Sequence, residues 1–426
     1  MIFATFQFGR VLTAAVLCIG LGCLGLGALA YAAPPHKPAS GLAHKPASGL
    51  ANKKEPGHKD EVAINAPHAI LIDAMNGAVL YEHDPDQLIF PASLGKLMTI
   101  EYVFNELKQG RLNLTDEFGV SENAWRKGGA PSHTSSMFVA LNSQVPVGDL
   151  IHGAIVQSGN DACIVLAEGI AGTEAAFGEK LTQRAREIGL KQSVFTNSNG
   201  LPDPGEKVTT RELGLLARKI ITDYPEMYQI FGEREYTWNK IRQQNRNPLL
   251  TMGIGADGLK TGFTSDAGYG LVGSAVQNGL RLIVVVNGEK SAKERGDDAK
   301  KLLEWGFKSF EQRILFAEGQ TIGVAKVYGG ATGRVPLKPT GAVRIMVPKA
   351  GGDRLIARIV YTGPVPAPIT EGQPIGVLKV WRNDNVILEM PLQAAESVGR
   401  GNITQRAFDA VSEMMVSLFR AGAERL

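Results

Sequence analysis

Three short motifs bring together residue types that can activate a serine for attack on a carbonyl carbon. In chain order they are Ser93-Leu94-Gly95-Lys96, Ser158-Gly159-Asn160 and Lys260-Thr261-Gly262. A serine hydroxyl is a weak nucleophile until a neighbouring base removes its proton. Each motif alone is short enough to occur by chance. The three together, in this order, indicate an acyl-transfer site that attacks a peptide or amide bond.

Ser93 and Lys96 are the nucleophile and the base of this prediction. Residues three positions apart on a helix share one face, so the two side chains can meet. Lysine accepts a proton only when neutral, and at its usual pKa of about 10.4 roughly one side chain in a few thousand is neutral at pH 7. Burial and a second cation both lower a lysine pKa, and Lys260 is the candidate for that cation. The alternative interpretation is a capping serine beside a solvated lysine.

Ser158 and Asn160 lie in a break between two predicted helices. In that position Ser158 can relay a proton to the leaving amine. Asn160 can hydrogen-bond the backbone amide of a substrate, or Lys96. Because serine, glycine and asparagine are all common in turns, a simple helix-capping turn is the alternative.

The third motif is predicted to bind substrate. Lys260 and Thr261 can hold a carboxylate, and Gly262 lets an extended peptide approach the edge of a strand closely. The backbone N–H groups of Ser93 and Phe263 are the candidate donors to an oxyanion. Further candidates for carboxylate binding are Thr264 and Arg246.

The elements that must position these residues are a mixture of helices and strands. Apolar periodicity predicts a buried helix after Pro91, which ends near Gly110. An Asn-Gly pair predicts a hairpin between the first two strands. The predicted ranges are strands 69–73, 78–82, 258–262, 268–275 and 280–286, and helices 147–156, 161–170, 211–221 and 293–310. Strands at both sequence ends with helices between them predict one antiparallel sheet completed by pairing of distant segments.

After residue 319 the sequence changes to short alternating strands separated by glycine and proline. These strands, predicted at 323–328, 343–348, 355–361, 377–381 and 386–390, indicate a small β-sandwich. The predicted fold class is therefore α/β (α+β), with an antiparallel sheet and helices in residues 63–315 and a β-rich domain in 320–395. Residues 400–426 return to helical periodicity.

Residues 1–33 are predicted to be a secretory signal peptide. Arg10 precedes a long apolar run, and Ala30-Tyr31-Ala32 offers a cleavage site. An uncleaved membrane anchor is the alternative, because the run is long for a signal core. A lipid anchor at Cys23 is disfavoured, since the preceding residues form a poor lipobox. Residues 34–62 are predicted to be a flexible linker, in which an octapeptide beginning at His36 is repeated from His44.

Composition excludes several other classes of function. A formal net charge of +3 over 426 residues is too small to indicate nucleic-acid binding. Neither H-E-x-x-H nor C-x-x-C is present, so no metal or other cofactor is predicted. Cys163 is the one cysteine after the predicted signal peptide, and its apolar neighbours place it in the core.

With these residues the chain resembles the low-molecular-weight penicillin-binding proteins of the D-alanyl-D-alanine carboxypeptidase family, peptidase family S11. The resemblance extends from about Ala63 to the C-terminus. It is carried by segments 91–99, 157–162 and 257–264, and supported by Asn245-Arg246-Asn247 and the predicted helix around 302–310. It implies the penicillin-binding/β-lactamase-like transpeptidase fold.

The resemblance also implies a reaction. Ser93 would attack the carbonyl between the two D-alanines that end a peptidoglycan stem pentapeptide, with Lys96 as general base. Ser158 and Asn160 would assist proton transfer and positioning, and Lys260 would bind substrate. β-Lactam antibiotics would acylate Ser93 as covalent inhibitors. Phe263 stands where relatives carry histidine, which affects expectations for substrate preference or deacylation rate.

Three alternatives to this activity remain open at the level of sequence. A D,D-endopeptidase of the same fold would cleave peptidoglycan cross-links. A class A-type β-lactamase would need a deacylating glutamate, and no convincing E-x-x-L-N segment lies between the second and third motifs. A catalytically silent peptidoglycan-binding protein would not need all three motifs.

Export would place the protein in the periplasm, at the outer face of the inner (cytoplasmic) membrane. An apolar stripe on the C-terminal helix predicts peripheral contact with that membrane. Its members are Ile403, Phe408, Val411, Met414, Met415, Leu418 and Phe419. From Glu396 onward arginines and acidic residues balance, so attraction to anionic lipid would be weak. A terminal helix packed on its own domain is the alternative.

Overall fold

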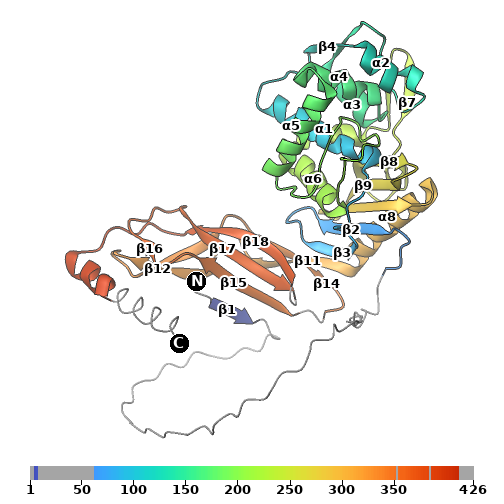
Figure 1. Cartoon of the computed structure of the whole chain (residues 1–426). Helices are drawn as coiled ribbons and strands as arrows, with labels where there is room; N and C mark the ends of the chain where they lie inside the picture. The colour runs from blue at the N-terminus through green and yellow to red at the C-terminus, as the bar shows by residue number, and fades with distance from the viewer. Residues whose placement is uncertain (1–3, 8–61, 352–353, 383–384, 412–426) are drawn as a thin grey trace, which may run out of the picture. The chain divides into compact units, whose positions relative to one another are not determined.

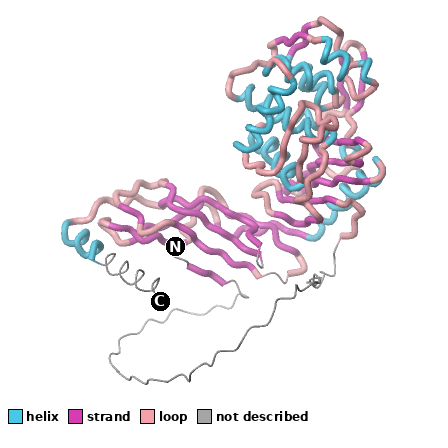
Figure 2. Tube along the Cα trace, viewed as in Figure 1, coloured by secondary structure: helices cyan, strands magenta, loops and turns pink. Residues whose placement is uncertain are grey.

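The computed structural model describes residues 4–7, 62–351, 354–382 and 385–411 (Figures 1 and 2). Most of the predicted signal peptide, nearly all of the linker and the end of the C-terminal helix lie outside the described residues. Within the predicted signal peptide, Ala4–Gln7 (β1) is a strand paired with β15 (Leu355–Tyr361). Among the described residues, no helix is both long and apolar enough to cross a bilayer.

A five-stranded antiparallel sheet supports the region that carries the three motifs. Its strand order is β3-β2-β10-β9-β8. β2 (His68–Asp73) and β3 (Val79–His83) form the predicted hairpin, whereas β8 (Ala256–Thr264), β9 (Gly268–Gln277) and β10 (Leu280–Glu289) come from the other end of the domain. The pairing of β2 with β10 confirms the predicted non-local closure. It leaves β8 as an outermost strand.

Hydrophobic layers cover both faces of this sheet. Successive side chains of a strand point to opposite faces. In β2, Ile70 and Ile72 therefore join the core beneath the main helical layer, whereas Leu71 joins the core beneath α8 (Ala292–Ser309). Figure 1 shows α8 beside the sheet and apart from the group formed by α1, α3, α4 and α5. Residues 282–286 are all buried because the central strand β10 is covered from both sides.

The main helical layer holds the first two motifs. A short 3-10 helix, η1 (Ala92–Gly95), leads directly into α1 (Lys96–Lys108). The predicted break at the second motif separates α3 (Val147–Ile155) from α4 (Asn160–Ala171). The remaining helices of this layer are α2 (Glu122–Gly128), α5 (Glu174–Glu187), α6 (Thr210–Asp223) and α7 (Pro225–Tyr228). Two small antiparallel pairs join β4 (Glu117–Gly119) to β5 (Gln144–Pro146), and β6 (Glu235–Trp238) to β7 (Ile241–Gln244).

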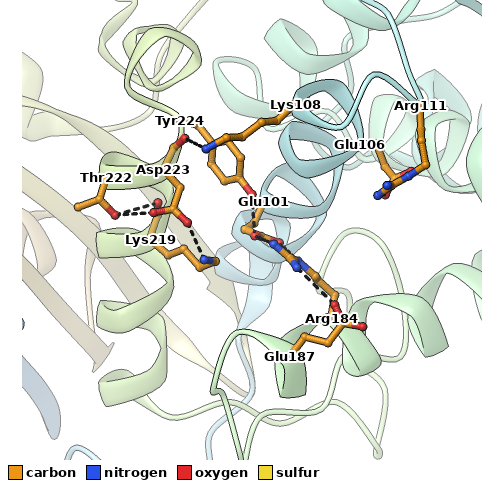
Figure 3. Close-up of polar contacts among 10 residues, drawn as sticks. All are labelled: Glu101, Glu106, Lys108, Arg111, Arg184, Glu187, Lys219, Thr222, Asp223 and Tyr224. Atoms are coloured by element: carbon orange, nitrogen blue, oxygen red, sulfur yellow. Dashed lines mark hydrogen bonds and ion pairs between the residues drawn. The ribbon is translucent and has the colours of Figure 1, made fainter. Parts of the chain in front are cut away.

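A buried ion pair fixes α1 against its neighbours (Figure 3). Glu101 is fully buried, and its carboxylate accepts hydrogen bonds from Arg184 Nη2 on α5 at 2.8 Å and from Tyr224 Oη at 3.0 Å. The guanidinium also bonds Glu101 through Nε at 3.2 Å. A buried carboxylate with several charge-assisted partners is stable only while those partners stay in place. The pair therefore sets the position of the helix that begins at Lys96.

The C-terminal region is rich in strands, as predicted. Its larger sheet has the order β1-β15-β17-β18-β13-β12-β16, and β11 pairs with β14 in a second, two-stranded sheet. The bounds are β11 (Phe310–Phe316), β12 (Gly323–Tyr328), β13 (Arg334–Pro339), β14 (Val343–Pro348), β16 (Val365–Pro366), β17 (Pro374–Arg382) and β18 (Asn385–Ala394). β11, β13 and the two-residue β16 are absent from the sequence prediction. β11 follows α8 without a turn, and two prolines interrupt β13.

Candidate active site

Ser93 lies on η1, one turn before α1 begins, and not within the first helical turn itself. Leu94, the next residue, is fully buried and anchors this turn in the core. Ser93 is only half-buried, whereas Ala92, Leu94 and Gly95 around it are buried. The fold therefore exposes the one side chain of the turn that can act as a nucleophile.

Lys96 is placed beside Ser93 as predicted. Its Nζ lies 2.8 Å from Ser93 Oγ and donates to the backbone carbonyl of Asn199, also at 2.8 Å. The pKa of Lys96 is lowered to about 8, chiefly by burial and also by the charge of Arg246, while Cys163, Glu206 and Asp161 act in the opposite direction. With this pKa, about one Lys96 side chain in ten is neutral at pH 7. Lys96 can therefore accept the Ser93 proton near neutral pH.

The second motif faces the third across the same site. Ser158 has φ 58°, a left-handed backbone conformation that is uncommon for a residue with a side chain. Lys260 Nζ donates to Ser158 Oγ at 2.8 Å, and both residues are buried. Burial, and secondly the charge of Lys96, lower the pKa of Lys260 well below its usual value. The two lysines and two serines thus form one electrostatically coupled group.

Asn160 is the first residue of α4, and the two polar atoms of its side-chain amide have different surroundings. Its Nδ2 donates to Thr134 Oγ1 at 2.9 Å, in place of the predicted alternative contact with Lys96. Its Oδ1 is buried and has no hydrogen-bond partner among the described residues. A buried amide oxygen without a partner costs stability unless a bound group supplies a donor. The Asn160 oxygen is therefore available to accept the N–H of a peptide.

Strand β8 brings the third motif against the nucleophile turn. A side-chain carbon added at Gly262 would lie 3.1 Å from Pro91 O and 3.2 Å from Leu94 N, so only glycine permits this approach without displacement. Lys260 and Thr261 are buried beside it. Because β8 pairs only with β9 among the described strands, its other edge can pair with an extended peptide.

Phe263 and Thr264 continue the strand beyond the motif. The ring of Phe263 is 52% exposed and stacks on Tyr269, with centroids 4.0 Å apart. Thr264 Oγ1 accepts a hydrogen bond from Ala267 N at 3.2 Å, so part of its capacity serves the turn between β8 and β9. The Phe263 N–H remains a predicted oxyanion donor.

Arginines add to the positive charge of the site. Arg246, predicted from sequence, donates to Ser135 Oγ on the loop that also holds Thr134. Arg295, which sequence analysis missed, is buried, donates to Gly262 O at 3.4 Å and lies over the Tyr269 ring. A site with these cations and the two motif lysines suits an anionic substrate group.

Several other residues that shape the site were also absent from the sequence prediction. Asn199 supplies the carbonyl that holds Lys96, and the loop before it is fastened to α1 because Thr99 Oγ1 donates to Ser198 O at 2.7 Å. Asp161 is fully buried and accepts from the N–H groups of Met137 and Phe138, both at 2.9 Å, which shapes the Thr134 loop. The Asn-Gly pair at 199–200 was the available signal for the first of these loops. Neither loop has a periodic pattern.

Cys163 lies in the core, as predicted. It is fully buried on α4, and burial raises the pKa of its thiol to about 11. A thiol with so high a pKa is almost entirely protonated at neutral pH and is a poor nucleophile.

The chain is similar to known protein families and to several individual proteins. The family model described as D-alanyl-D-alanine carboxypeptidase matches residues 53–291, and the model of the C-terminal domain of penicillin-binding protein 5 matches residues 310–400. The chain is 39% identical over 352 residues to D-alanyl-D-alanine carboxypeptidase DacC of Escherichia coli, covering 82% of this chain and 88% of that protein. It is 39% identical over 359 residues to DacA of Haemophilus influenzae, covering 84% and 91%.

Solved structures show the same likeness. Penicillin-binding protein 5 from Haemophilus influenzae aligns with a TM-score of 0.71 at 39% identity, covering 82% of this chain and all of that one. Penicillin-binding protein D2 from Listeria monocytogenes, in its cefotaxime-bound form, aligns with a TM-score of 0.53 at 31% identity, covering 58% of this chain and 99% of that one.

Proposed function

We propose that this chain, which belongs to the D-alanyl-D-alanine carboxypeptidase family, removes the terminal D-alanine of peptidoglycan stem pentapeptides. The reaction proceeds through an acyl-enzyme on Ser93. One observation carries the assignment of residues: Lys96 Nζ lies 2.8 Å from Ser93 Oγ, and Lys260 Nζ lies 2.8 Å from Ser158 Oγ, within one site. The first pair suits activation of the nucleophile. The second suits delivery of a proton to the leaving group.

Acylation then proceeds with each proton accounted for. Neutral Lys96 takes the Ser93 proton as Oγ attacks the carbonyl carbon between the two D-alanines. The N–H groups of Ser93 and Phe263 stabilise the resulting oxyanion. When the C–N bond breaks, Ser158 gives its proton to the departing amine of D-alanine, and Ser158 is reprotonated by Lys260. Lys96 then releases the proton that it took from Ser93 and Lys260 takes one up, by exchange with solvent, so that both lysines return to their starting states. An ester between Ser93 and the shortened peptide remains.

Hydrolysis of that ester completes the cycle. A water molecule loses a proton to a base of the site and attacks the ester carbonyl, and Ser93 recovers its proton as the shortened peptide leaves. Lys96 is the base nearest to Ser93 among the described residues and suits both steps. Its pKa of about 8 allows it to exchange protons in either direction near neutral pH.

Substrate binding is assigned to groups that surround this centre. The unpartnered Asn160 Oδ1 accepts an N–H of the stem peptide, and the free edge of β8 holds the peptide in extended form. The terminal carboxylate is bound by Lys260, Thr261 and Arg246, on the cationic side of the site. β-Lactam antibiotics acylate Ser93 in the same orientation, since they carry a carboxylate beside a reactive amide.

We place the protein outside the cytoplasm, in the periplasm at the outer face of the inner membrane. The support is the predicted signal peptide and the helix at 403–411, on which Ile403, Phe408 and Val411 are exposed. Exposed apolar residues at helical spacing suit a helix that lies in the membrane interface.

The proposal is tested with purified protein, a stem pentapeptide and a cross-linked muropeptide. We expect release of free D-alanine from the pentapeptide, covalent labelling by a fluorescent penicillin, and loss of both in Ser93→Ala. Cleavage of cross-links without D-alanine release from the pentapeptide would identify an endopeptidase instead. Penicillin labelling of Ser93→Ala at the wild-type rate would refute the assignment of the nucleophile.

A further inference from the structure

A buried glutamate lies behind the nucleophile turn and has no part in the mechanism described so far. Glu206 is 1% exposed. Its Oε2 accepts a hydrogen bond from Thr196 Oγ1 at 3.1 Å. Its Oε1 is buried and has no hydrogen-bond partner among the residues that the structure describes. A buried carboxyl group in this condition is costly to a fold, which is a reason to ask what it does.

Glu206 Oε1 faces the backbone between the nucleophile and its base. A side-chain carbon added at Gly95 would lie 3.0 Å from this oxygen and 3.2 Å from Gly200 Cα. Gly200 itself has φ 74°, and a side-chain carbon there would lie 1.8 Å from Ala92 O. The segment 196–200 is therefore pressed directly against η1, with the glutamate filling the remaining space.

The same segment holds Lys96. Asn199 O accepts the hydrogen bond from Lys96 Nζ, and Asn197 Oδ1 shapes the turn by accepting from Gly200 N at 2.7 Å. Glu206 holds the start of this segment through Thr196. A change at Glu206 is thus transmitted to Lys96 by geometry, through the position of the Asn199 carbonyl, and by charge, through space.

We propose that Glu206 is a positioning residue for acylation, whose carboxyl group braces the 196–200 segment against the Ser93 turn and whose charge governs how readily Lys96 gives up its proton. This proposal rests on the proposed function only in taking Lys96 as the base. Glu206 does not touch the reacting atoms. It acts through Lys96 and Asn199.

Electrostatics agree with this geometry. Burial raises the pKa of Glu206 to about 8, against the opposing effects of the Thr196 hydroxyl and of the Thr196 and Asn197 backbone. A negative charge on Glu206 raises the pKa of Lys96. The two groups therefore exchange protons with solvent in the same pH range. The other titratable and charged groups of this neighbourhood are Asp203 beside Glu206, Glu174 on α5, which accepts from Ser198 Oγ, and, near Lys96, Cys163, Arg246, Asp161 and Lys260.

Ionisation of Glu206 should slow acylation, because it raises the pKa of Lys96. Below pH 8 most Glu206 is neutral and leaves the proton affinity of Lys96 low. As pH rises through 8, Glu206 ionises and holds the proton on Lys96 more strongly. Removal of this charge should therefore matter little at pH 6.5, most near pH 8, and little again above pH 9, where Lys96 is neutral with or without it. It should shift the acid limb of the acylation profile to lower pH and make it steeper.

The test compares wild type with Glu206→Gln, which keeps the shape of the side chain and an oxygen for Thr196. The measurement is the second-order rate constant of acylation by a fluorescent penicillin between pH 6 and 10. We expect equal rates at pH 6.5. In Glu206→Gln the midpoint of the acid limb should lie about 0.3 to 0.5 pH unit lower, with a rate about 1.5-fold higher near pH 8, because the variant lacks the charge that holds the proton on Lys96. Glu187→Gln, which removes an exposed carboxylate on α5, should leave the profile unchanged.

A second variant separates bracing from charge. Glu206→Ala removes both, so we expect the same shift of the profile together with a lower rate at every pH. Coincident profiles for Glu206→Gln and wild type would overturn the proposal, as would an equal loss of rate at all pH values in that variant. The assay reports on Ser93 and Lys96 whichever peptide bond is cleaved. Normal penicillin labelling without D-alanine release would therefore count against the proposed function and leave the inference about Glu206 standing.

Discussion

Lys260 Nζ and Ser158 Oγ lie 2.8 Å apart although their residues are separated by 102 positions in the chain. The contact joins an outermost strand of the sheet to the break between α3 and α4, and it is buried. The two motifs lie in separate elements, so the contact exists only when the strand and the helices are packed together. Because the fold brings them together, Lys260 can return a proton to Ser158 after Ser158 has protonated the leaving group.

Removal of the Ser158 hydroxyl tests this path. We expect Ser158→Ala to lower kcat for D-alanine release by about 10²- to 10⁴-fold, the usual contribution of a positioned proton donor. Ser265→Ala, which removes an exposed hydroxyl beyond the end of β8, should have little effect. Release by Ser158→Ala within threefold of wild type would show that the proton reaches the amine by another route.

The pH dependence of acylation should report the state of Lys96. The reactive form is the neutral amine, and burial sets the pKa of Lys96 at about 8. Well below this value the rate should fall about tenfold for each pH unit, and well above it the rate should level off. Stopped-flow acylation of the wild type by a chromogenic β-lactam measures the profile. A midpoint near 10, the ordinary value for lysine, would contradict the burial argument.

The ion pair of Figure 3 predicts a difference between two arginine substitutions. Arg184→Ala leaves Glu101 charged and fully buried, and should lower the free energy of unfolding by about 3 kcal/mol. Arg111→Ala breaks the pair with Glu106 in the same region, but the Arg111 side chain is exposed, so little change is expected. Urea denaturation of the two variants measures the contrast. Equal effects would show that burial does not set the strength of these pairs.

Phe263 should affect substrate binding more than stability. Its ring is half-exposed and stacks on Tyr269 beside the strand edge that we assign to the substrate. We expect Phe263→Ala to lower kcat/KM for the pentapeptide about three- to tenfold, the loss of one aromatic contact of roughly 1 kcal/mol. Ile241→Ala, which also removes an exposed apolar side chain, should leave kcat/KM unchanged. An unaltered kcat/KM in Phe263→Ala would exclude the ring from the binding site.

The C-terminal helix should determine binding to lipid. A chain truncated after Ser397, and full-length Phe408→Asp, should both lose sedimentation with vesicles of mixed neutral and anionic phospholipid, because each removes exposed apolar surface from the helix. Asp409→Asn, a neighbour on the same helix, should retain it. Vesicle binding by the truncated chain at the level of the full-length protein would locate the contact elsewhere.

Much of the fold was predictable because its elements carry strong periodic signals. The apolar spacing after Pro91 predicted the helix that became α1. The alternating runs after residue 319 predicted five strands, three at their observed bounds and two within the longer strands β17 and β18. Glycine and proline residues indicated where most of the predicted helices and strands end. β11 was not predicted because Glu311, Gln312 and Arg313 fit a helix as well as a strand. The strand is stabilised by its pairing with β14, which the sequence pattern does not reveal.

The sequence predicted the site residues that belong to short motifs. It did not predict the residues that reach the site only through the packing of distant loops. Spacing alone brought Ser93 and Lys96 together. The carbonyl of Asn199 and the carboxyl of Glu206 could not be found in this way, because their roles arise from a loop that closes over η1 from a hundred residues away. The left-handed backbone of Ser158 likewise depends on its surroundings, since the residue type does not favour it.

The open edge of β8 has a cost for a protein that must remain monodisperse while it waits for substrate. An unpaired strand edge is a template on which any extended chain, including a second copy, can add a strand and begin to aggregate. Lys260 interrupts this template with a cation whose burial already lowers its pKa. Lys260 is already buried, and a neutral strand laid on this edge would supply no counter-charge for it. The charge that we assign to recognition of a carboxylate thus also selects against every peptide that lacks one.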